Sequence, residues 1–373
     1  MSSAPAPVLP RLGQEPLRVM VVDDSVVVRG LLSRWVSQHG SMEVVATASN
    51  GRLALDKLET LDPDIILLDL DMPELDGIAA LPLILRKRPN VSVLVTSTLT
   101  ARNAEISLKC LSLGAVDYLP KPESNRDLTT SQSFRHELVT KLDAIGTARR
   151  RRNVRPSEPR VTETGRQRRP VQPALRAPTA PRCLLIGAST GGPQAIAQLL
   201  GEMAPIVDRM PVLIVQHMPP IFTAVFAEHL KNQTGNMVRE PFDGERLLPG
   251  TVYVAPGGRH MGVTRVNGHP AVRLDDGPPV NYCRPAVDVL FEDAAEVFAS
   301  SALAIILTGM GSDGTRGARA LSDAGATIVA QDEASSIVWG MPGNVVRAGL
   351  ASAVLPLSDI SGAMKDLMRE RLA

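Results

Sequence analysis

The strongest constraint on the fold is the alternation of short apolar runs with amphipathic stretches along residues 17 to about 125. The predicted strands are 17–22, 42–48, 65–68, 91–96 and 118–120, and helical patterns cover 27–39 and 51–61. In such an alternation each helix carries the chain back along one face of the sheet, so neighbouring strands run parallel. The sequence therefore predicts a doubly wound parallel sheet in an α/β domain whose sites form beyond the carboxyl ends of its strands.

A second part of the chain, residues 182–373, repeats this pattern. Its predicted strands are 183–186, 212–215, 251–255, 302–307 and 326–330, and 272–274 beside an Asp-Gly pair is expected in a hairpin. Most of these runs alternate with helical patterns, which favours a mostly parallel α/β domain. A chain of 373 residues is long enough for two domains, each with its own core.

The segment between these domains, residues 126–181, is predicted to be an Arg- and Pro-rich linker. Residues 138–152 have a helical pattern with an apolar seam of Leu138, Leu142 and Ile145. The arginines of 149–152 and those that follow among Pro, Thr and Gln cannot bury a core, so we expect a flexible tether. A basic linker of this kind also suits contact with nucleic acid or acidic lipid, and the sequence leaves that alternative open.

Overall composition excludes several classes of function. The chain is 44% hydrophobic and 21% charged with a net charge of +1, which is typical of a globular protein and unlike a dedicated nucleic-acid binder. No apolar run has the length of a membrane span, and the first residues lack the apolar core of a signal peptide, so we expect a cytoplasmic protein that is not membrane-inserted. The cysteines Cys110, Cys183 and Cys283 are far apart, which favours reduced thiols over a disulfide framework or a metal site.

Polar residues follow several predicted strands of the first domain. Asp23 and Asp24 follow 17–22, Asp69 follows 65–68, and Thr96 and Lys121 end later strands. Carboxylates gathered at one sheet edge need a divalent cation, and an all-oxygen set suits Mg²⁺. A carboxylate held in this way can attack a phosphoryl group. The alternative is that each acidic residue is a solvated turn residue.

The motifs Val21–Ser25, Leu67–Gly77, Thr96-Ser97 and Gly114–Pro122 resemble the receiver domain of two-component response regulators. The resemblance implies a flavodoxin-like fold for this domain, and it implies that Asp69 is phosphorylated by a histidine kinase. It also implies that Asp23, Asp24, Asp69 and the backbone carbonyl of Asp71 hold Mg²⁺. Thr96 and Tyr118 would form the switch pair, and Lys121 would contact the phosphoryl group.

In the second domain, the stretch Gly187–Gly192 lies between the strand 183–186 and a helical pattern over 193–200. A serine between glycines at a strand-to-helix turn is typical of a nucleophile elbow, which makes Ser189 a candidate nucleophile. The helix that follows directs free backbone N–H groups toward developing negative charge. A turn that binds phosphate, or that only reverses the chain, is the alternative.

A serine nucleophile needs a base and an acid that orients the base. Among the histidines after Ser189, only His217 ends an apolar strand. His229 lies in the helical stretch 222–230, His260 in a loop that follows two glycines, and His269 in an expected hairpin turn. Asp313, in the glycine-rich stretch 307–314, is the first candidate for the acid, although it also suits a helix cap, and Asp332 is the fallback.

The motifs Gly187–Pro193, Gln216–Pro219, Leu307–Gly314 and Gln331–Ser335 resemble the chemotaxis protein-glutamate methylesterase family, CheB. The resemblance implies a triad of Ser189, His217 and Asp313, with Thr190, Gly191 and Met310 at the oxyanion and substrate site and residues 253–260 lining it. It implies hydrolysis of glutamate methyl esters on methyl-accepting chemotaxis receptors, deamidation of receptor glutamines, and no cofactor for the hydrolysis. Phosphorylation of Asp69 is expected to relieve inhibition by the receiver. The competing hypothesis is a phosphorylation-gated binding module that has kept the hydrolase fold for recognition only.

Overall fold

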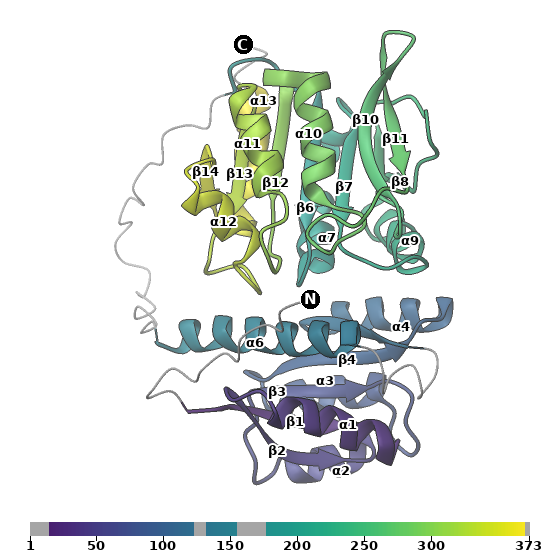
Figure 1. Cartoon of the computed structure of the whole chain (residues 1–373), viewed down its shortest axis with the longest axis vertical. Coiled ribbons are helices and arrows are strands. Elements are labelled where there is room, and N and C mark those ends of the chain that lie inside the picture. The colour runs from purple at the N-terminus through teal and green to yellow at the C-terminus, as the bar shows by residue number, and fades with distance from the viewer. Residues whose placement is uncertain (1–14, 123–131, 155–176, 370–373) are drawn as a thin grey trace, which may run out of the picture. The chain divides into compact units, whose positions relative to one another are not determined.

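The computed structural model describes residues 15–122, 132–154 and 177–369 of the chain (Figure 1). The chain divides into two compact units, the first ending at Arg149 and the second beginning at Arg150. We describe each unit by itself.

The first unit contains a five-stranded parallel sheet. Its strands are β1 (Leu17–Val22), β2 (Met42–Ala48), β3 (Ile65–Asp69), β4 (Ser92–Thr98) and β5 (Asp117–Lys121). The strand order β2-β1-β3-β4-β5 reverses at β1, so the carboxyl ends of β1 and β3 lie side by side at the reversal. This confirms the predicted flavodoxin-like sheet.

Helices connect these strands, and each begins at a residue that caps it. The helices are α1 (Val26–Ser37), α2 (Gly51–Lys57), α3 (Gly77–Lys87) and α4 (Ala101–Ser112). Ser25, Asn50, Asp76 and Thr100 each accept a hydrogen bond from the backbone N–H three residues later, which satisfies one donor of the first turn. The predicted helices 27–39 and 51–61 end earlier, at Ser37 and Lys57, because the chain continues there as hydrogen-bonded turns.

A further helix, α6 (Gln132–Val154), follows the strands of the first unit. The predicted seam of Leu138, Leu142 and Ile145 is buried, together with Phe134, whose ring lies 6.0 Å from that of Trp35 in α1. The first compact unit therefore extends past residue 125, through a helix that the sequence analysis placed in the linker. Apolar side chains at helical spacing explain this, because they give the helix a face to bury. The linker residues 155–176 lie outside the described residues.

The second unit contains a seven-stranded parallel sheet in the order β14-β13-β12-β6-β7-β9-β8. Its strands are β6 (Cys183–Ala188), β7 (Val212–Gln216), β8 (Met237–Arg239), β9 (Thr251–Val254), β12 (Ala302–Ile306), β13 (Thr327–Gln331) and β14 (Ala353–Leu355). Its helices are α7 (Gly192–Glu202), α8 (Ala204–Val207), α9 (Phe222–Thr234), α10 (Val287–Phe298), the 3-10 turn η1 (Ala299–Ser301), α11 (Thr315–Asp323), α12 (Met341–Arg347) and α13 (Leu357–Arg369). The short edge strands β8 and β14 are the ones that the sequence analysis did not predict.

An antiparallel hairpin of β10 (His260–Val266) and β11 (His269–Asp275) lies beside this sheet in Figure 1. It confirms the hairpin expected around residues 272–274. His260 is a correction, because it begins β10 and is buried rather than lying in an open loop.

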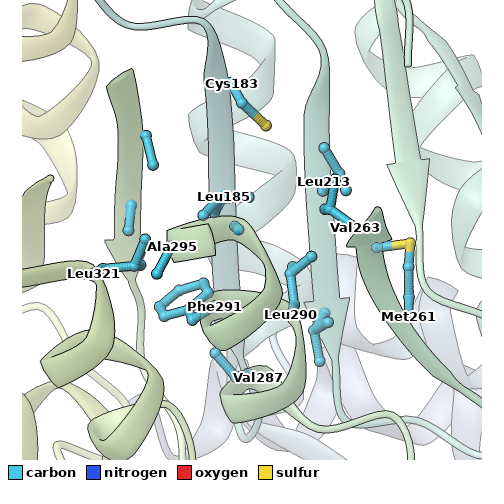
Figure 2. Close-up of a cluster of buried hydrophobic side chains, with 14 of the residues drawn as sticks. Cys183, Leu185, Leu213, Met261, Val263, Val287, Leu290, Phe291, Ala295 and Leu321 are labelled. Atoms are coloured by element: carbon cyan, nitrogen blue, oxygen red, sulfur yellow. The ribbon is translucent and has the colours of Figure 1, made fainter. Parts of the chain in front are cut away.

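Close packing of α10 on the sheet fixes one end of that helix. Figure 2 shows Val287, Leu290 and Phe291 of α10 within the buried cluster that also holds Leu185 of β6. A Cβ at Gly187 would lie 2.5 Å from the Val287 side chain, so only glycine allows this approach at the end of β6. The first residues of α10 are thereby held at the carboxyl end of β6.

Candidate functional sites

The carboxyl edge of the first sheet gathers the acidic residues that the sequence analysis singled out. Carboxylate oxygens of Asp23, Asp24 and Asp69 lie within 4.8 Å of one another. Asp23 and Asp69 are buried and Asp24 is exposed. The ammonium of Lys121 lies 2.9 Å from Asp23 Oδ2 and 2.7 Å from Asp69 Oδ1.

Burial and charge act together on this cluster. Burial is the main cause that raises the pKa of Asp69 to about 6; the neighbouring charge of Asp23 raises it further, and Lys121 opposes the shift. Burial alone would lower the pKa of Lys121, but Asp69 and Asp23 outweigh it and raise that pKa. One lysine thus leaves negative charge uncompensated. Carboxylates in this arrangement suit a small hard cation such as Mg²⁺, so the residues present fit the ion.

The other predicted residues of this edge lie on β4, β5 and the loop after β3. Thr96 is buried and pairs with Asp69 in the register of β3 and β4. Tyr118 is buried in β5, and the ammonium of Lys141 lies 5.4 Å from the centre of its ring. The side chain of Asp71 accepts a hydrogen bond of 3.1 Å from Asn103 in α4.

In the second unit, Ser189 lies in the turn between β6 and α7. Its backbone N–H donates to the carbonyl of Thr308 at 3.1 Å, and its carbonyl accepts from the N–H of Gly192 at 2.7 Å. Gly191 has a φ of 75°, a left-handed conformation that favours glycine. The turn is therefore held on both sides, as a nucleophile elbow requires.

His217 is brought next to this turn by the pairing of β6 with β7. Ala188 pairs with Gln216 in the parallel register, and the N–H of His217 donates to the carbonyl of Ala188 at 3.2 Å. Ser189 and His217 therefore follow the ends of adjacent strands. The Nε2 atom of His217 lies 2.7 Å from Asp313 Oδ2.

Asp313 lies between β12 and α11, and its buried carboxylate contacts the first turn of α10, where it accepts several hydrogen bonds. Its Oδ2 accepts from the N–H of Val287 at 2.6 Å, and its Oδ1 accepts from the N–H of Asp288 and from Asn281 Nδ2, both at 3.1 Å. Burial would raise the pKa of Asp313, but the hydrogen bonds and charge of His217 and the backbone donors lower it. The carboxylate is thus held ionised, as an orienting acid must be.

The second ring nitrogen of His217 faces a residue that the sequence analysis did not include in the site. Nδ1 lies 3.5 Å from the Sγ atom of Cys283, and among the described residues no hydrogen bond joins His217 to the Ser189 hydroxyl. In unliganded enzymes such catalytic bonds are often long and shorten with substrate. Burial would lower the pKa of His217, but its contact with Cys283 and its hydrogen bond to Asp313 outweigh burial and raise that pKa to about 10.

The residues expected at the oxyanion site surround Ser189. Among the described residues, no backbone hydrogen bond uses the N–H groups of Thr190, Gly191 or Met310. The Thr190 hydroxyl is also buried with no partner within that part of the chain. Gly257, from the stretch expected to line the site, packs against the backbone of Pro219 and Pro220 just after His217.

Other candidates lie elsewhere or were missed. The carboxylate of Asp332 accepts from the N–H and hydroxyl of Ser335, so the fallback acid is a turn cap. His260 bonds the carbonyl of Pro278 and the N–H of Ala286, which supports the chain before α10. Asn281 and Cys283 were missed as site residues because only the folded loop brings them to Asp313 and His217.

Among the residues with described structure, no helix combines the length and the apolar character needed to cross a lipid bilayer.

Comparisons with known proteins agree with this division of the chain. The family model "CheB methylesterase" matches residues 184–364, and "Response regulator receiver domain" matches residues 19–132. A protein-glutamate methylesterase/protein-glutamine glutaminase of Rhodopseudomonas palustris (strain HaA2) is 52% identical over 96% of this chain and 95% of its own. A Nitrobacter hamburgensis relative of the same name is 51% identical over 93% of each chain. The solved CheB methylesterase catalytic domain of Thermotoga maritima is 39% identical, covers 52% of this chain and 100% of its own, and has a TM-score of 0.48.

Proposed function

The chain belongs to the CheB methylesterase family, and on that premise we propose that it is a protein-glutamate methylesterase and protein-glutamine glutaminase. It hydrolyses methyl esters of glutamate side chains on chemoreceptors, releasing methanol, and converts selected receptor glutamines to glutamate, releasing ammonia. The observation that carries the proposal is the 2.7 Å pair of His217 and Asp313 at the strand end beside the Ser189 turn.

Proton transfer in this reaction uses a defined nitrogen of His217. Because Asp313 binds Nε2, only Nδ1 remains to accept the proton of the Ser189 hydroxyl. The serine oxygen attacks the side-chain carbonyl carbon, and His217 returns the proton to the leaving methanol or ammonia. A water molecule then attacks the acyl-enzyme with the same base, which releases glutamate and restores Ser189.

Asp313 makes Nδ1 a base. Its carboxylate accepts a hydrogen bond from the N–H at Nε2 of His217, which fixes the tautomer that has a free lone pair on Nδ1. The same carboxylate stabilises the imidazolium that forms during the reaction. The backbone donors of α10 in turn hold the carboxylate in place. This is why the packing of α10 on β6 matters for the chemistry.

The N–H groups of Thr190, Gly191 and Met310 are the donors that we assign to the oxyanion. They follow Ser189 or the end of β12, and none is used by another backbone bond of the described residues. Each such donor contributes roughly 10²–10³ in rate.

Control is assigned to the receiver. A histidine kinase is the proposed phosphoryl source, and Asp69 is the acceptor. Asp23, Asp24, Asp69 and the backbone carbonyl of Asp71 would hold Mg²⁺, which would supply positive charge for phosphoryl transfer when bound. Lys121 and Thr96 contact the new phosphoryl oxygens, and Tyr118 is the switch partner of Thr96. Phosphorylation then relieves inhibition of the hydrolase.

The test is methanol release from methylated receptor membranes by the full chain, with and without acetyl phosphate as phosphodonor. We expect stimulation by the phosphodonor in the native chain and none in Asp69→Asn. Loss of turnover in Ser189→Ala with receptor binding kept supports the enzyme. Equal turnover in Ser189→Ala would refute the serine mechanism.

The competing hypothesis of a binding module predicts that no form of the protein releases methanol. It also predicts that phosphorylation changes only the affinity for the receptor. A location in the cytoplasm and the absence of nucleic-acid binding remain predictions from the sequence.

A further inference from the structure

Cys283 occupies a position that the hydrolase mechanism does not use. Its Sγ atom lies 3.5 Å from Nδ1 of His217, the nitrogen that serves Ser189. Cys283 is only half-buried, whereas Cys110 and Cys183 are fully buried. Of the three cysteines, it alone is open to solvent and in contact with the proposed base.

The loop that carries Cys283 is held in place by the catalytic carboxylate. Val280 and Cys283 exchange backbone hydrogen bonds of 3.0 and 2.8 Å, and Asn281 and Tyr282 between them have φ values of 51° and 63°. Residues other than glycine seldom adopt this left-handed conformation. Asn281 supports it by donating to Asp313 at 3.1 Å and to Asp288 at 2.9 Å. The Sγ atom of Cys283 also lies 3.4 Å from the carbonyl oxygen of Asn281, so the loop holds the thiol between that carbonyl and the imidazole.

Cys283, His217 and Asp313 thus form a thiol–imidazole–carboxylate series. In such a series the imidazole accepts the thiol proton and the resulting thiolate is the reactive species. Reagents in solution have access to the loop, because Tyr282, the residue before the thiol, is 100% exposed.

We propose that Cys283 is a modification site for small soft electrophiles, and that its alkylation switches the hydrolase off. The inference rests on the proposed function, in which His217 is the base for Ser189. The thiol proton passes to Nδ1 of His217, the thiolate forms a bond to the electrophilic carbon, and the leaving group departs with its electron pair. With iodoacetamide an S–CH₂ bond forms, the C–I bond breaks and iodide leaves. The new group occupies the space beside Nδ1 and separates the base from Ser189.

The experiment uses the full chain, iodoacetamide, peptide mass spectrometry and methanol release measured in parallel. We expect Cys283 to be alkylated at least about tenfold faster than Cys110 and Cys183, since burial keeps those thiols protonated and out of reach. Activity should fall in proportion to the alkylation of Cys283. The thermal unfolding midpoint, measured before and after, shows whether the fold has been kept.

Variants separate this site from a general effect of the reagent. In Cys283→Ser we expect most of the activity present before treatment to survive it, and in the matched control Cys110→Ser we expect inactivation as in the native chain. For each variant, the activity after treatment is divided by the activity of the same variant before treatment. Differences in basal rate between the variants therefore do not affect the comparison. If the serine variant fails to fold, Cys283→Ala replaces it.

Two results would overturn the proposal. One is equal labelling of the three cysteines in the folded protein, and the other is full activity with Cys283 completely alkylated. Failure of the proposed function looks different, since Ser189→Ala would then turn over normally without any reagent. Turnover in Ser189→Ala together with none in Cys283→Ser would make the thiol the nucleophile and replace both assignments.

Discussion

Replacing Asp313 by asparagine tests the proposed chemistry and its structural support in one variant. Both carboxylate oxygens act as acceptors: Oδ2 for His217 and the Val287 N–H, and Oδ1 for Asn281 and the Asp288 N–H. An amide has one oxygen and one NH₂ group. Whichever way it is turned, its NH₂ group faces a backbone N–H of α10 that loses its acceptor.

The magnitude follows from these contacts. A buried donor without an acceptor costs about 1–3 kcal/mol, so we expect the second unit of Asp313→Asn to unfold with that much less free energy. If the NH₂ group faces His217, the ring must accept at Nε2 and carry its proton on Nδ1, where it cannot take the proton of Ser189. The same exchange in a Ser–His–Asp triad lowers kcat about 10⁴-fold, or roughly 5 kcal/mol in the barrier.

The assay is methanol release under saturating phosphodonor, with urea unfolding of the same preparations. The matched control is Asp332→Asn, which removes a carboxylate that caps a turn and does not contact His217. We expect the control to keep kcat within about twofold, because it leaves the hydrogen bond that orients the base untouched. An Asp313→Asn variant within tenfold of the native kcat would refute the assigned role of this residue.

Four further predictions concern the site and the fold. Protonated His217 has no lone pair on Nδ1, so kcat/KM should rise with pH toward the His217 pKa of about 10. Cys283→Ser should move that rise to lower pH, because the contact with Cys283 is one cause of the raised pKa. Because this pKa is raised from 6.5, the free energy of unfolding that His217 adds is complete below pH 6.5 and is lost toward pH 10. Urea unfolding of the native chain and of Cys283→Ser over this pH range will show the loss. Leu138→Ala should destabilise the first unit by about 2–5 kcal/mol in urea unfolding, since Leu138 is 0% exposed, whereas a mere tether would show no change. Gly309→Ala places a Cβ against Met341 Sδ and 3.0 Å from both N and Cβ of Ser189, and we expect roughly 10²-fold lower kcat in the methanol assay because the Ser189 turn must shift. A native-like kcat would contradict the requirement for a fixed Ser189 turn.

The sequence predicted the two sheets well because the cues are local. An apolar run such as 65–68 followed by Asp69 predicts a buried strand with a polar residue at its carboxyl end. A parallel sheet brings the carboxyl ends of its strands to one edge. His217 was identified in the same way, as the one histidine directly at a strand end.

Contacts between distant segments were not predictable in this way. The helix predicted over residues 138–152 is confirmed as part of α6. Whether this helix packs on the first unit depends on the apolar surface that Trp35 and its neighbours form. The edge strands β8 and β14 have three residues each, too few to show a period.

The sequence by itself determined the fold class, the acidic edge of the receiver and the candidate triad. Each of these is indicated by local patterns, namely strand ends and glycine turns that are only a few residues long. Only the tertiary structure decided which nitrogen of His217 binds Asp313, and that Cys283 faces the other one. The physical reason is that a hydrogen bond from Asn281 to Asp313, which lies thirty-two positions further along the chain, holds the loop over Val280–Cys283. No local pattern encodes a bond over that separation, so the neighbours of the base become visible only in the folded protein.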